Sequence, residues 1–310
     1  MKALPSWPEL PTPDEWKETL DNLHMWTQIV GKIRLLYMPW INHSWHTTFY
    51  LSATGLTTSL IPQTYGGFEI SFNFIDHRLN IKTVGGENRT IDLQPMTVAE
   101  FYHDLKVKLN ELDISAEIYE KPVELPDPIV PFPQNNKHAA YDKEAVYRFW
   151  RALIDVHKVF TKFRAGFQGK ASPVHFFWGA FDLAVTFFSG RKAPRHPGGI
   201  PNCPDRVMEE AYSRELSSAG FWPGGGNVAE PAFYAYAYPE PDGYRTAASL
   251  PEGAFYHESL GEYLFPYRIV RNSENPDETL LSFLKATYEA ASIHGDWDKV
   301  LHGEKESHAR

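Results

Sequence analysis

Cysteine is almost absent from this sequence: Cys203 is the only one in 310 residues. A single cysteine cannot form an intrachain disulfide, which is typical of a cytoplasmic protein with a free thiol. The N-terminal stretch MKALPSWPELPTP has no apolar run of signal-peptide length. The longest apolar run, about residues 174–188, is interrupted by Asp182 and is too short to cross a bilayer. We therefore expect a soluble, cytoplasmic protein with no membrane partner.

Positive charge is also scarce. Thirty Lys and Arg residues stand against 39 Asp and Glu residues, giving a formal net charge of −9 and a pI near 5.8. A nucleic-acid binder should carry a net basic footprint, so we expect no nucleic-acid partner. Common enzyme motifs are missing as well. Gly169-Lys170 lacks the upstream glycine and preceding strand of a phosphate loop, and G-x-S-x-G, H-E-x-x-H and paired C-x-x-C do not occur.

Aromatic residues, by contrast, are abundant. Twenty Phe, 16 Tyr and 9 Trp make up 15% of the chain. Such side chains bury large areas and suit β-strands, which predicts a substantial, sheet-rich core. The length of 310 residues favours two domains or one large composite domain.

Three segments carry helix start signals followed by apolar residues at helical spacing. They begin at Thr12, where Thr12-Pro13-Asp14-Glu15 forms a capping box and Gly31 marks the end; at Asp142; and at Asn275, with Gly295 as the end. A fourth helix is expected over 98–112. Period-two alternation predicts strands over 45–54, 68–75 and 233–238, with a hairpin turn at 84–87. This antiparallel pattern, without repeated βαβ units, predicts an α+β fold.

The segment 120–137, EKPVELPDPIVPFPQNNK, is rich in proline and lacks helical periodicity. We interpret it as the boundary between two α+β halves, residues 1–125 and 138–303, with a linker over 126–137 and a disordered tail over 304–310. Both halves contain a capped helix, a Gly-Lys pair and aromatic strands in similar order. They could be two copies of an ancient duplication packed together, although residue identity between them is low.

The stretch 172–192, SPVHFFWGAFDLAVTFFSGRK, predicts one long apolar strand with His175 near its start and Asp182 in its middle. A lone carboxylate in a covered sheet is costly unless it is paired or hydrogen-bonded, so Asp182 needs a partner. His175 could serve as a proton acceptor or be a satisfied core histidine. The stretch indicates a pocket or a structural ion pair and does not identify a reaction.

His43 and His46 lie in the run NHSWH, directly before Tyr50. Imidazole is a common metal ligand, and both rings could bind one ion if His43 bends back from a loop. Residues three apart in a regular strand point to opposite faces, so the spacing itself does not support a metal site. The favoured alternative is that His43 caps a turn and His46 hydrogen-bonds on a polar sheet face.

Basic residues gather between positions 162 and 195. There are six of them, Lys162, Arg164, Lys170, Arg191, Lys192 and Arg195, against one acid, Asp182. In an acidic chain such a cluster could bind a carboxylate or phosphate on a small ligand. The alternative is a solvated rim paired with acids from elsewhere in the chain.

The segment 209–226, EEAYSRELSSAGFWPGGG, runs from acidic residues into a glycine-rich loop. It contains Glu210, Tyr212 and Trp222. A general acid or base followed by a mobile lid would look like this. A helix end followed by a long turn would look the same.

Several long runs in this chain resemble a known family. These are LHMWTQIVGK, NHSWH, FNFIDHRL, SPVHFFWGAFDLA, EAYSRELSSAGFWPGG and FYAYAYPEP. In this order they resemble bacterial proteins catalogued as a domain of unknown function. The resemblance implies a single evolutionary unit from about Trp7 to Trp297, and it implies no activity, substrate or cofactor.

Three functions compete: a small-molecule enzyme, a non-catalytic ligand-binding protein, and an interaction or scaffold protein. We favour the enzyme, because polar groups among many aromatic residues are typical of a ligand site. Its expected catalytic residues are His46, His175 and Glu210, and no metal is expected. The expected substrate-binding residues are His43, Tyr50, Arg164, Lys170, Asp182, Arg191, Tyr212 and Trp222. The expected substrate is a small molecule, and one option is that it carries an anionic group. The sequence predicts neither a cofactor nor an oligomeric state.

Overall fold

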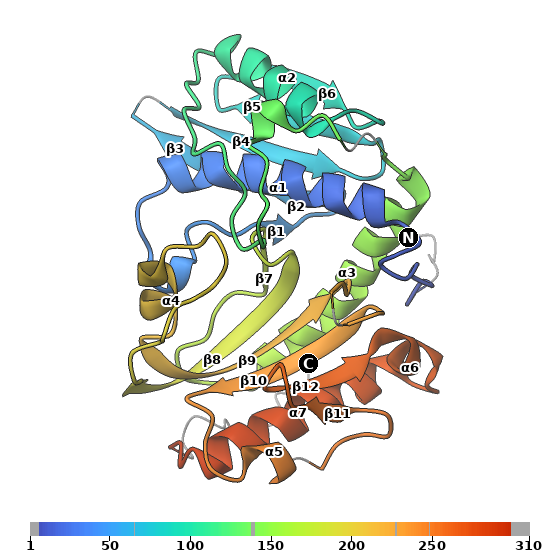
Figure 1. Ribbon diagram of the computed structural model, residues 1–310, viewed down its shortest axis with the longest axis vertical. Coiled ribbons are helices and arrows are strands. Elements are labelled where there is room, and N and C mark those ends of the chain that lie inside the picture. The colour runs from blue at the N-terminus through green and yellow to red at the C-terminus, as the bar shows by residue number, and fades with distance from the viewer. Residues whose placement is uncertain (1–5, 65, 138–139, 227, 248, 299–310) are drawn as a thin grey trace, which may run out of the picture.

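The computed structural model describes residues 6–64, 66–137, 140–226, 228–247 and 249–298. The expected disordered tail over 304–310 lies outside these residues. Two six-stranded antiparallel sheets with flanking helices form the fold (Figure 1). The predicted α+β class is therefore confirmed, and each half of the chain contributes one sheet.

The N-terminal half consists of one sheet covered by two helices. Its elements are α1 (Lys17–Tyr37), η1 (Asn42–Ser44), β1 (Tyr50–Leu51), β2 (Gly55–Thr57), β3 (Ile61–Gln63), β4 (Gly66–Asn73), β5 (Arg78–Thr83), β6 (Asn88–Asp92), α2 (Val98–Asn110) and η2 (Phe132–Gln134). The strand order is β1-β2-β4-β5-β6, and β3 also pairs with β4. The two helices meet where Trp26 of α1 stacks on Phe101 of α2, with ring centroids 4.8 Å apart.

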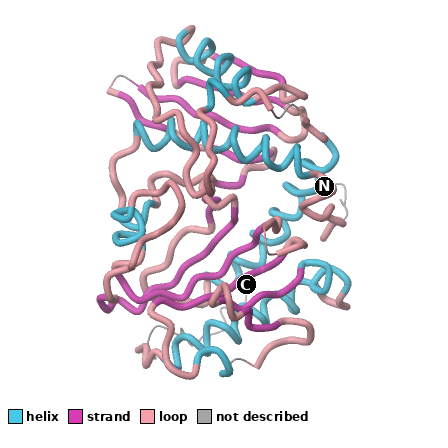
Figure 2. The backbone as a smooth tube through the Cα atoms, viewed as in Figure 1, coloured by secondary structure: helices cyan, strands magenta, loops and turns pink. Residues whose placement is uncertain are grey.

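The C-terminal half is built around the second sheet. Its elements are α3 (Lys143–Arg164), β7 (His175–Phe177), β8 (Asp182–Lys192), α4 (Asp205–Ala211), β9 (Arg214–Trp222), β10 (Ala232–Tyr238), α5 (Tyr244–Ala247), β11 (Phe255–His257), β12 (Glu262–Pro266), α6 (Tyr267–Asn272) and α7 (Pro276–His294). The strand order is β11-β12-β10-β9-β8-β7. Helices α3 and α7 pack against this sheet and against each other (Figure 2).

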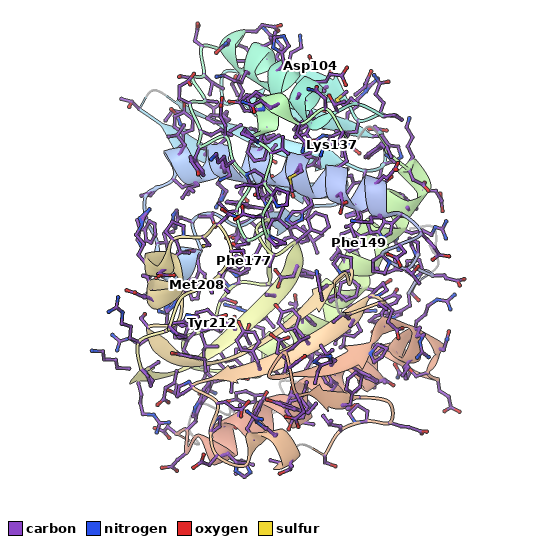
Figure 3. The ribbon with its side chains drawn as sticks, in the orientation of Figure 1. Asp104, Lys137, Phe149, Phe177, Met208 and Tyr212 are labelled. Atoms are coloured by element: carbon purple, nitrogen blue, oxygen red, sulfur yellow. The ribbon has the colours of Figure 1, made fainter. Side chains whose placement is uncertain are left out.

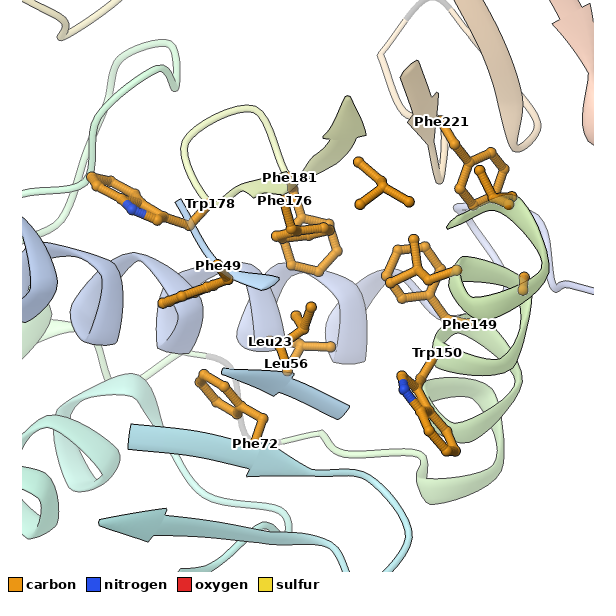
Figure 4. Close-up of a cluster of buried hydrophobic side chains, with 14 of the residues drawn as sticks. Leu23, Phe49, Leu56, Phe72, Phe149, Trp150, Phe176, Trp178, Phe181 and Phe221 are labelled. Atoms are coloured by element: carbon orange, nitrogen blue, oxygen red, sulfur yellow. The ribbon is translucent and has the colours of Figure 1, made fainter. Parts of the chain in front are cut away.

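The two sheets are joined by backbone pairing between Phe49, just before β1, and Phe176 of β7. Each amide donates to the other residue's carbonyl, at 2.9 and 2.8 Å. Around this junction the buried rings form one continuous core that includes residues of both halves (Figure 4). Phe149 of α3, for example, stacks on Phe181 and Phe221, with centroids 5.7 and 6.3 Å away.

Two of the three predicted helix starts, at Asp142 and Asn275, are confirmed by their caps. The Asp142 carboxylate accepts from the amides of Glu144 and Ala145, and the Asn275 side chain accepts from Glu278. The start predicted at Thr12 was wrong, because residues 13–16 form a turn and α1 begins at Lys17 without a side-chain cap. One predicted end was wrong, because α1 continues past Gly31 to Tyr37. The lack of a side chain at Gly31 serves packing here: a Cβ at this position would lie 2.3 Å from the Trp178 ring.

Strands β4 and β10 and the hairpin between β5 and β6 confirm the predictions for 68–75, 233–238 and 84–87. The strand predicted over 45–54 was wrong except at Tyr50–Leu51. Residues His43 and Ser44 adopt left-handed φ values of 60° and 58°, so NHSWH forms a turn. The alternation of apolar and polar residues there reflects this turn and not a strand.

The single strand predicted over 172–192 was also wrong. The chain forms a hairpin instead, in which β7 pairs with β8 and Phe177 is the Cα partner of Asp182. Phe181 adopts a left-handed φ of 60° in the turn between them. Asp182 therefore begins a strand and does not lie in the middle of one.

The first described residues pack on the C-terminal half. The Trp7 amide donates to the Asp155 carboxylate at 2.7 Å, and the Tyr267 hydroxyl donates to the Pro8 carbonyl at 2.8 Å. Within the proline-rich segment, Phe132 is fully buried. These contacts bind the halves together; the proposed boundary over 126–137 stays a prediction.

Gly31→Ala should destabilise the protein, since the new methyl group would overlap the Trp178 ring. Overpacking of this kind costs about 1–3 kcal/mol, which outweighs the gain of about 1 kcal/mol from replacing a helical glycine by alanine. Chemical denaturation measures the difference. The control is Gly85→Ala in the β5–β6 hairpin, where the nearest atom to the new Cβ is 3.5 Å away. Equal stability of the two variants would contradict the packing argument.

Candidate functional site

The two faces of the C-terminal sheet differ in chemistry. Phe187 of β8 belongs to the apolar core, whereas Asp182 and Thr186 of the same strand point to the opposite face. Tyr234 and Tyr236 of β10 share that opposite face through the pairing of β8, β9 and β10. We define the acid-tyrosine cluster as Glu124, Asp182, Tyr212, Tyr234, Tyr236 and Glu262. Figure 3 shows Tyr212 close to Met208 of α4 on this side of the sheet.

Asp182 finds its required partner in Tyr234, whose hydroxyl donates to Oδ2. The side chain is 6% exposed. Burial raises the pKa of Asp182 to about 6, and the hydrogen bond from Tyr234 partly opposes this rise. The Tyr234 ring lies directly over Gly220 of β9, where a Cβ would be 2.2 Å from the ring atom Cζ. The glycine thus makes room for the tyrosine that holds Asp182.

A chain of hydroxyl groups runs beside this pair. Thr186 and Ser218 lie 2.9 Å apart between their hydroxyl oxygens, and the hydroxyls of Tyr212 and Tyr236 lie 2.7 Å apart. A hydrogen bond to Ser218 connects Tyr236 with the first pair. Burial raises the pKa of Tyr212 to about 12 and that of Tyr236 well above its ordinary value. These hydroxyls keep their protons at neutral pH and can donate.

Glu124 and Glu262 complete the cluster. Burial, followed by the negative charge of Asp182, raises the pKa of each carboxyl to about 7. Glu124 has a left-handed φ of 59°, and its carboxyl lies over Gly179, where a Cβ would be 2.0 Å from Oε1. Burial lowers the pKa of Lys32 of α1 to about 8, and the charge of Glu124 opposes this fall.

The position of Glu124 depends on α1. The amide side chain of Gln28 donates to the Val123 carbonyl at 2.9 Å and accepts from the Val123 amide at 2.8 Å. This double contact fixes the residue before Glu124. On the same helix, His24 lies 2.9 Å from the Gly179 carbonyl oxygen and holds the β7–β8 turn. One helix therefore positions both the Glu124 backbone and the turn that its carboxyl covers.

The cluster can transfer protons near neutral pH. Its carboxyls have pKa values of about 6 to 7, so each changes protonation in the physiological range. Glu124, Tyr212, Tyr234, Tyr236 and Glu262 are all partly exposed. Solutes can therefore reach these side chains although the surrounding protein shifts their pKa values.

Of the predicted catalytic residues, His46 and His175 lie near each other around Arg34. Both are buried, at 1% and 0% exposure, and burial is the main cause that lowers the pKa of each. Arg34 lowers both further, whereas the Ile41 carbonyl and the Glu210 charge raise the pKa of His46. His175 Nδ1 lies 3.1 Å from the Thr48 hydroxyl. Tyr50, a predicted substrate-binding residue, has its ring centroid 6.4 Å from that of His175. The structure thus brings these residues together, and their roles stay predictions.

Glu210 contacts a different histidine. Both of its carboxylate oxygens accept from the backbone amide of His43 at 2.8 Å. The His43 ring lies between the Ala211 carbonyl, 2.8 Å from Nδ1, and the Lys170 ammonium, 2.6 Å from Nε2. A proton on Nδ1 satisfies both contacts, because Lys170 can only donate. Glu210 therefore holds the NHSWH turn in place, whereas the His43 ring contacts the carbonyl of Ala211 at the end of α4.

Four of the five remaining basic residues have partners, and the fifth, Lys192, is exposed. Lys162 pairs with Glu278, Arg191 with Glu215 and Arg195 with Glu209, and Arg164 donates to the Ser172 carbonyl. Arg191 also donates to the carbonyls of Gly295 and Asp296 at the end of α7. The three ion pairs fit the alternative interpretation, in which these basic residues form a solvated rim paired with acids from elsewhere in the chain.

Trp222 is partly buried and packs with Tyr234 against Val228, Ala232 and Leu264. It borders the acid-tyrosine cluster without a polar contact of its own among the described residues. One surface depression of about 480 Å³ is lined by Trp7, Lys158 and Arg271, and another of about 210 Å³ by Arg191 and Trp297. The lining of neither includes a residue of the cluster.

The described part of the chain contains neither a cluster of metal ligands nor a membrane-spanning helix. No group of three or more His, Cys, Asp and Glu residues there could hold a metal ion. No helix within it is both long enough and apolar enough to span a membrane.

Sequence reasoning missed Glu124, Glu262, Lys32 and Arg34. The first lies in the proline-rich segment that was interpreted as a linker, and the second in a strand with no motif. The grouping of Tyr234 and Tyr236 on one face of a strand was a sequence signal for a polar site on the sheet. It could have prompted a search for acids on neighbouring strands.

Comparison with known proteins gives one match. The model of a family described as a family of unknown function (DUF5996) matches residues 7–303. No curated protein and no solved structure matches the chain. The resemblance noted from the sequence motifs is confirmed over nearly the full chain.

The stability of Asp182→Asn relative to the natural protein should depend on pH. In the folded state the pKa of Asp182 rises from 3.8 to about 6, so ionisation of this carboxyl destabilises the protein as pH increases through that interval. The shift corresponds to about 3 kcal/mol. The variant should therefore gain up to that amount relative to the natural protein between pH 4 and pH 8, as measured by urea denaturation.

The matched control is Asp14→Asn, which makes the same change at an exposed position. Comparing each variant with the natural protein at the same pH cancels the titration of groups that do not interact with Asp182. Glu124 and Glu262 contribute to the difference, because the charge of Asp182 raises the pKa of each. A difference for Asp182→Asn that stays constant across the pH range would show that Asp182 is ionised throughout.

Proposed function

The chain belongs to the DUF5996 family, whose function is unknown, and from the site itself we propose that it is an enzyme. It would act on a small molecule bound against the acid-tyrosine cluster. The reaction type is proton transfer by general acid-base catalysis. Asp182 is the main proton-transfer group, with Glu124 and Glu262 beside it.

One observation carries this proposal: three carboxyls with pKa values of about 6 to 7 gather on one face of the sheet, where Glu124 and Glu262 are partly exposed and Asp182 is buried. A structural role would be served better by ion pairs, which lower the pKa of a carboxyl. Here burial raises the pKa of all three carboxyls, and the charge of Asp182 raises that of Glu124 and Glu262 further. Such destabilised acids are characteristic of sites that need them for chemistry, since the general acid or base works best with a pKa near the operating pH.

The hydrogen bonds assign roles within the cluster. Tyr234 donates to Asp182 Oδ2, while Oδ1 has no hydrogen-bond partner among the described residues. Protonated Asp182 can donate a proton to a substrate, and the Tyr234 hydroxyl then stabilises the carboxylate that remains. The hydroxyls of Thr186, Ser218, Tyr236 and Tyr212 offer further donors for polar groups of a ligand.

The alternative is a non-catalytic protein that binds the same ligand. The partly exposed tyrosine rings and carboxyls would bind a polar small molecule whether or not it reacts. We place the protein in the cytoplasm, because its single cysteine, Cys203, is a free thiol.

Asp182→Asn should abolish conversion of the substrate. Removing a positioned proton donor lowers rates by about 10²–10⁴. The experiment incubates the natural protein and the variant with a bacterial metabolite extract and follows by mass spectrometry which compounds disappear and which appear. The rate of the natural enzyme should change with an apparent pKa near 6 to 7, as the cited carboxyl values require.

The control for this experiment is Asp92→Asn, which changes an exposed carboxylate paired with Arg78. Its conversions should match those of the natural protein. Identical conversions by Asp182→Asn would remove Asp182 from the reaction. A compound that binds the natural protein and is recovered unchanged would favour the non-catalytic alternative.

A further inference from the structure

A second group of polar side chains lies beside the edge of β7 that pairs with Phe49, and its centre is Arg34. The side chain comes from the last turns of α1 and is 4% exposed. Its Nη1 donates to the Thr58 carbonyl, and its Cζ lies 5.7 Å from the Tyr50 ring centroid. Nε is buried and has no acceptor in the described part of the chain. No carboxylate among those residues forms an ion pair with this guanidinium.

Buried arginines are nearly always paired with an acid, because an uncompensated charge inside a protein costs several kcal/mol. Burial lowers the pKa of Arg34, but arginine keeps its proton in proteins and cannot escape this cost by becoming neutral. The Thr58 carbonyl satisfies only one of the five N–H donors. Arg34 therefore requires a negative charge that the described side chains do not supply.

Two buried histidines beside Arg34 have an open ring nitrogen each. His46 Nε2 and His175 Nε2 lack a hydrogen-bond partner among the described residues. The charge of Arg34 acts on both rings, and that of Arg164 acts on His175 as well. Burial and these cations lower the pKa of His175 to about 3, so this ring is neutral at physiological pH.

The contacts of Nδ1 in His46 and in His175 are compatible with a proton on Nε2 of each ring. His46 Nδ1 lies 3.2 Å from the Ile41 amide and 3.1 Å from the Ile41 carbonyl oxygen. The amide donates to Nδ1 when that nitrogen carries no proton, and a protonated Nδ1 donates to the carbonyl instead. His175 Nδ1 lies 3.1 Å from the Thr48 hydroxyl, whose single hydrogen can go to this nitrogen or to the Trp45 carbonyl, 3.3 Å away. With the proton on Nε2, each ring presents an N–H on its open side. Both histidines then become donors next to a guanidinium.

We propose that Arg34, His46 and His175 form a binding site for an oxyanion, a carboxylate or phosphate group carried by the substrate. The guanidinium supplies the charge, and the two Nε2–H groups supply directional hydrogen bonds. The link to the substrate rests on the proposed function; the binding of the anion does not. A metal ion is disfavoured at the same nitrogens, because the Arg34 charge acts on both rings and would repel it, whereas the Glu210 carboxylate acts on His46 alone.

Access to this site is through aromatic side chains. The rings of Trp45, Tyr50 and Phe177 have centroids 6.3, 6.4 and 4.7 Å from that of His175. All three side chains are partly exposed, so they separate the buried nitrogens from water. Rotation of these rings would admit an anion. On the same side of the hairpin, Phe177 pairs with Asp182, which places the proposed oxyanion site next to the acid-tyrosine cluster.

The test uses the full-length protein with ¹⁵N-labelled histidine, observed by NMR during titration. The probes are inorganic phosphate in one arm and acetate in the other, at constant ionic strength and up to about 20 mM. We expect saturable shifts of the His46 and His175 Nε2 resonances in at least one arm, and the arm with the tighter binding identifies the oxyanion class. His103, an exposed histidine of α2, provides the internal reference. Absence of a saturable shift in both arms overturns the proposal without any variant.

Variants then assign the binding to Arg34. Arg34→Gln should weaken anion binding by about tenfold or more, because a charge-assisted contact is lost. Arg89→Gln, which removes an exposed arginine paired with Glu111, should leave it unchanged. Equal affinity in Arg34→Gln and the natural protein would refute the assignment. If Arg34→Gln does not fold, Arg34→Lys provides the comparison, with weaker binding expected since Lys cannot form the same directional contacts.

Asp182→Asn separates this inference from the proposed function. The variant should bind phosphate or acetate as the natural protein does and lose substrate conversion. Anion binding without any Asp182-dependent conversion would leave the oxyanion site intact and refute only the proposed reaction. Loss of anion binding in Asp182→Asn would contradict the separate site built on Arg34.

Discussion

Two backbone hydrogen bonds between Phe49 and Phe176 hold the N-terminal sheet against the first strand of the C-terminal sheet. Both rings are almost fully buried, so the bonds form away from competing water. The neighbouring residues Thr48 and His175 meet because of this pairing. The oxyanion site is thus assembled from both halves, and the acid-tyrosine cluster lies along the same hairpin, one strand further into the sheet.

The parts of the fold that could be predicted from the sequence are those with local causes. Asp142 and Asn275 begin their helices because each side chain satisfies amides two or three residues away. The tyrosines of β10 share a face because side chains alternate along a strand. NHSWH failed as a strand because its conformation depends on Glu210, 167 residues further along the chain. No local pattern contains that contact.

The residues of the candidate site also divide into those that the local sequence indicates and those that depend on distant contacts. Asp182 could be singled out, because an acid in an apolar strand requires a partner, but the identity of that partner could not be read from its own neighbourhood. Glu124 reaches the site only because Gln28 holds the preceding residue and Gly179 leaves space for the carboxyl. Arg34 resembles any surface arginine in an amphipathic helix until the buried environment of its guanidinium is known. The acids of the acid-tyrosine cluster lie apart from the Arg34 guanidinium along β7 and β8. This separation likewise arises only in the tertiary structure.

The pairing of the two sheets also has a consequence for synthesis on the ribosome. Thr48 and His175 are 127 residues apart, so the N-terminal sheet leaves the ribosome well before the strand that it joins. During that interval the edge beside Phe49 has no partner from its own chain, and exposed strand edges are prone to pairing with other molecules. The brevity of β1, only two residues long, limits this hazard, because so short an edge offers few backbone groups to a wrong partner.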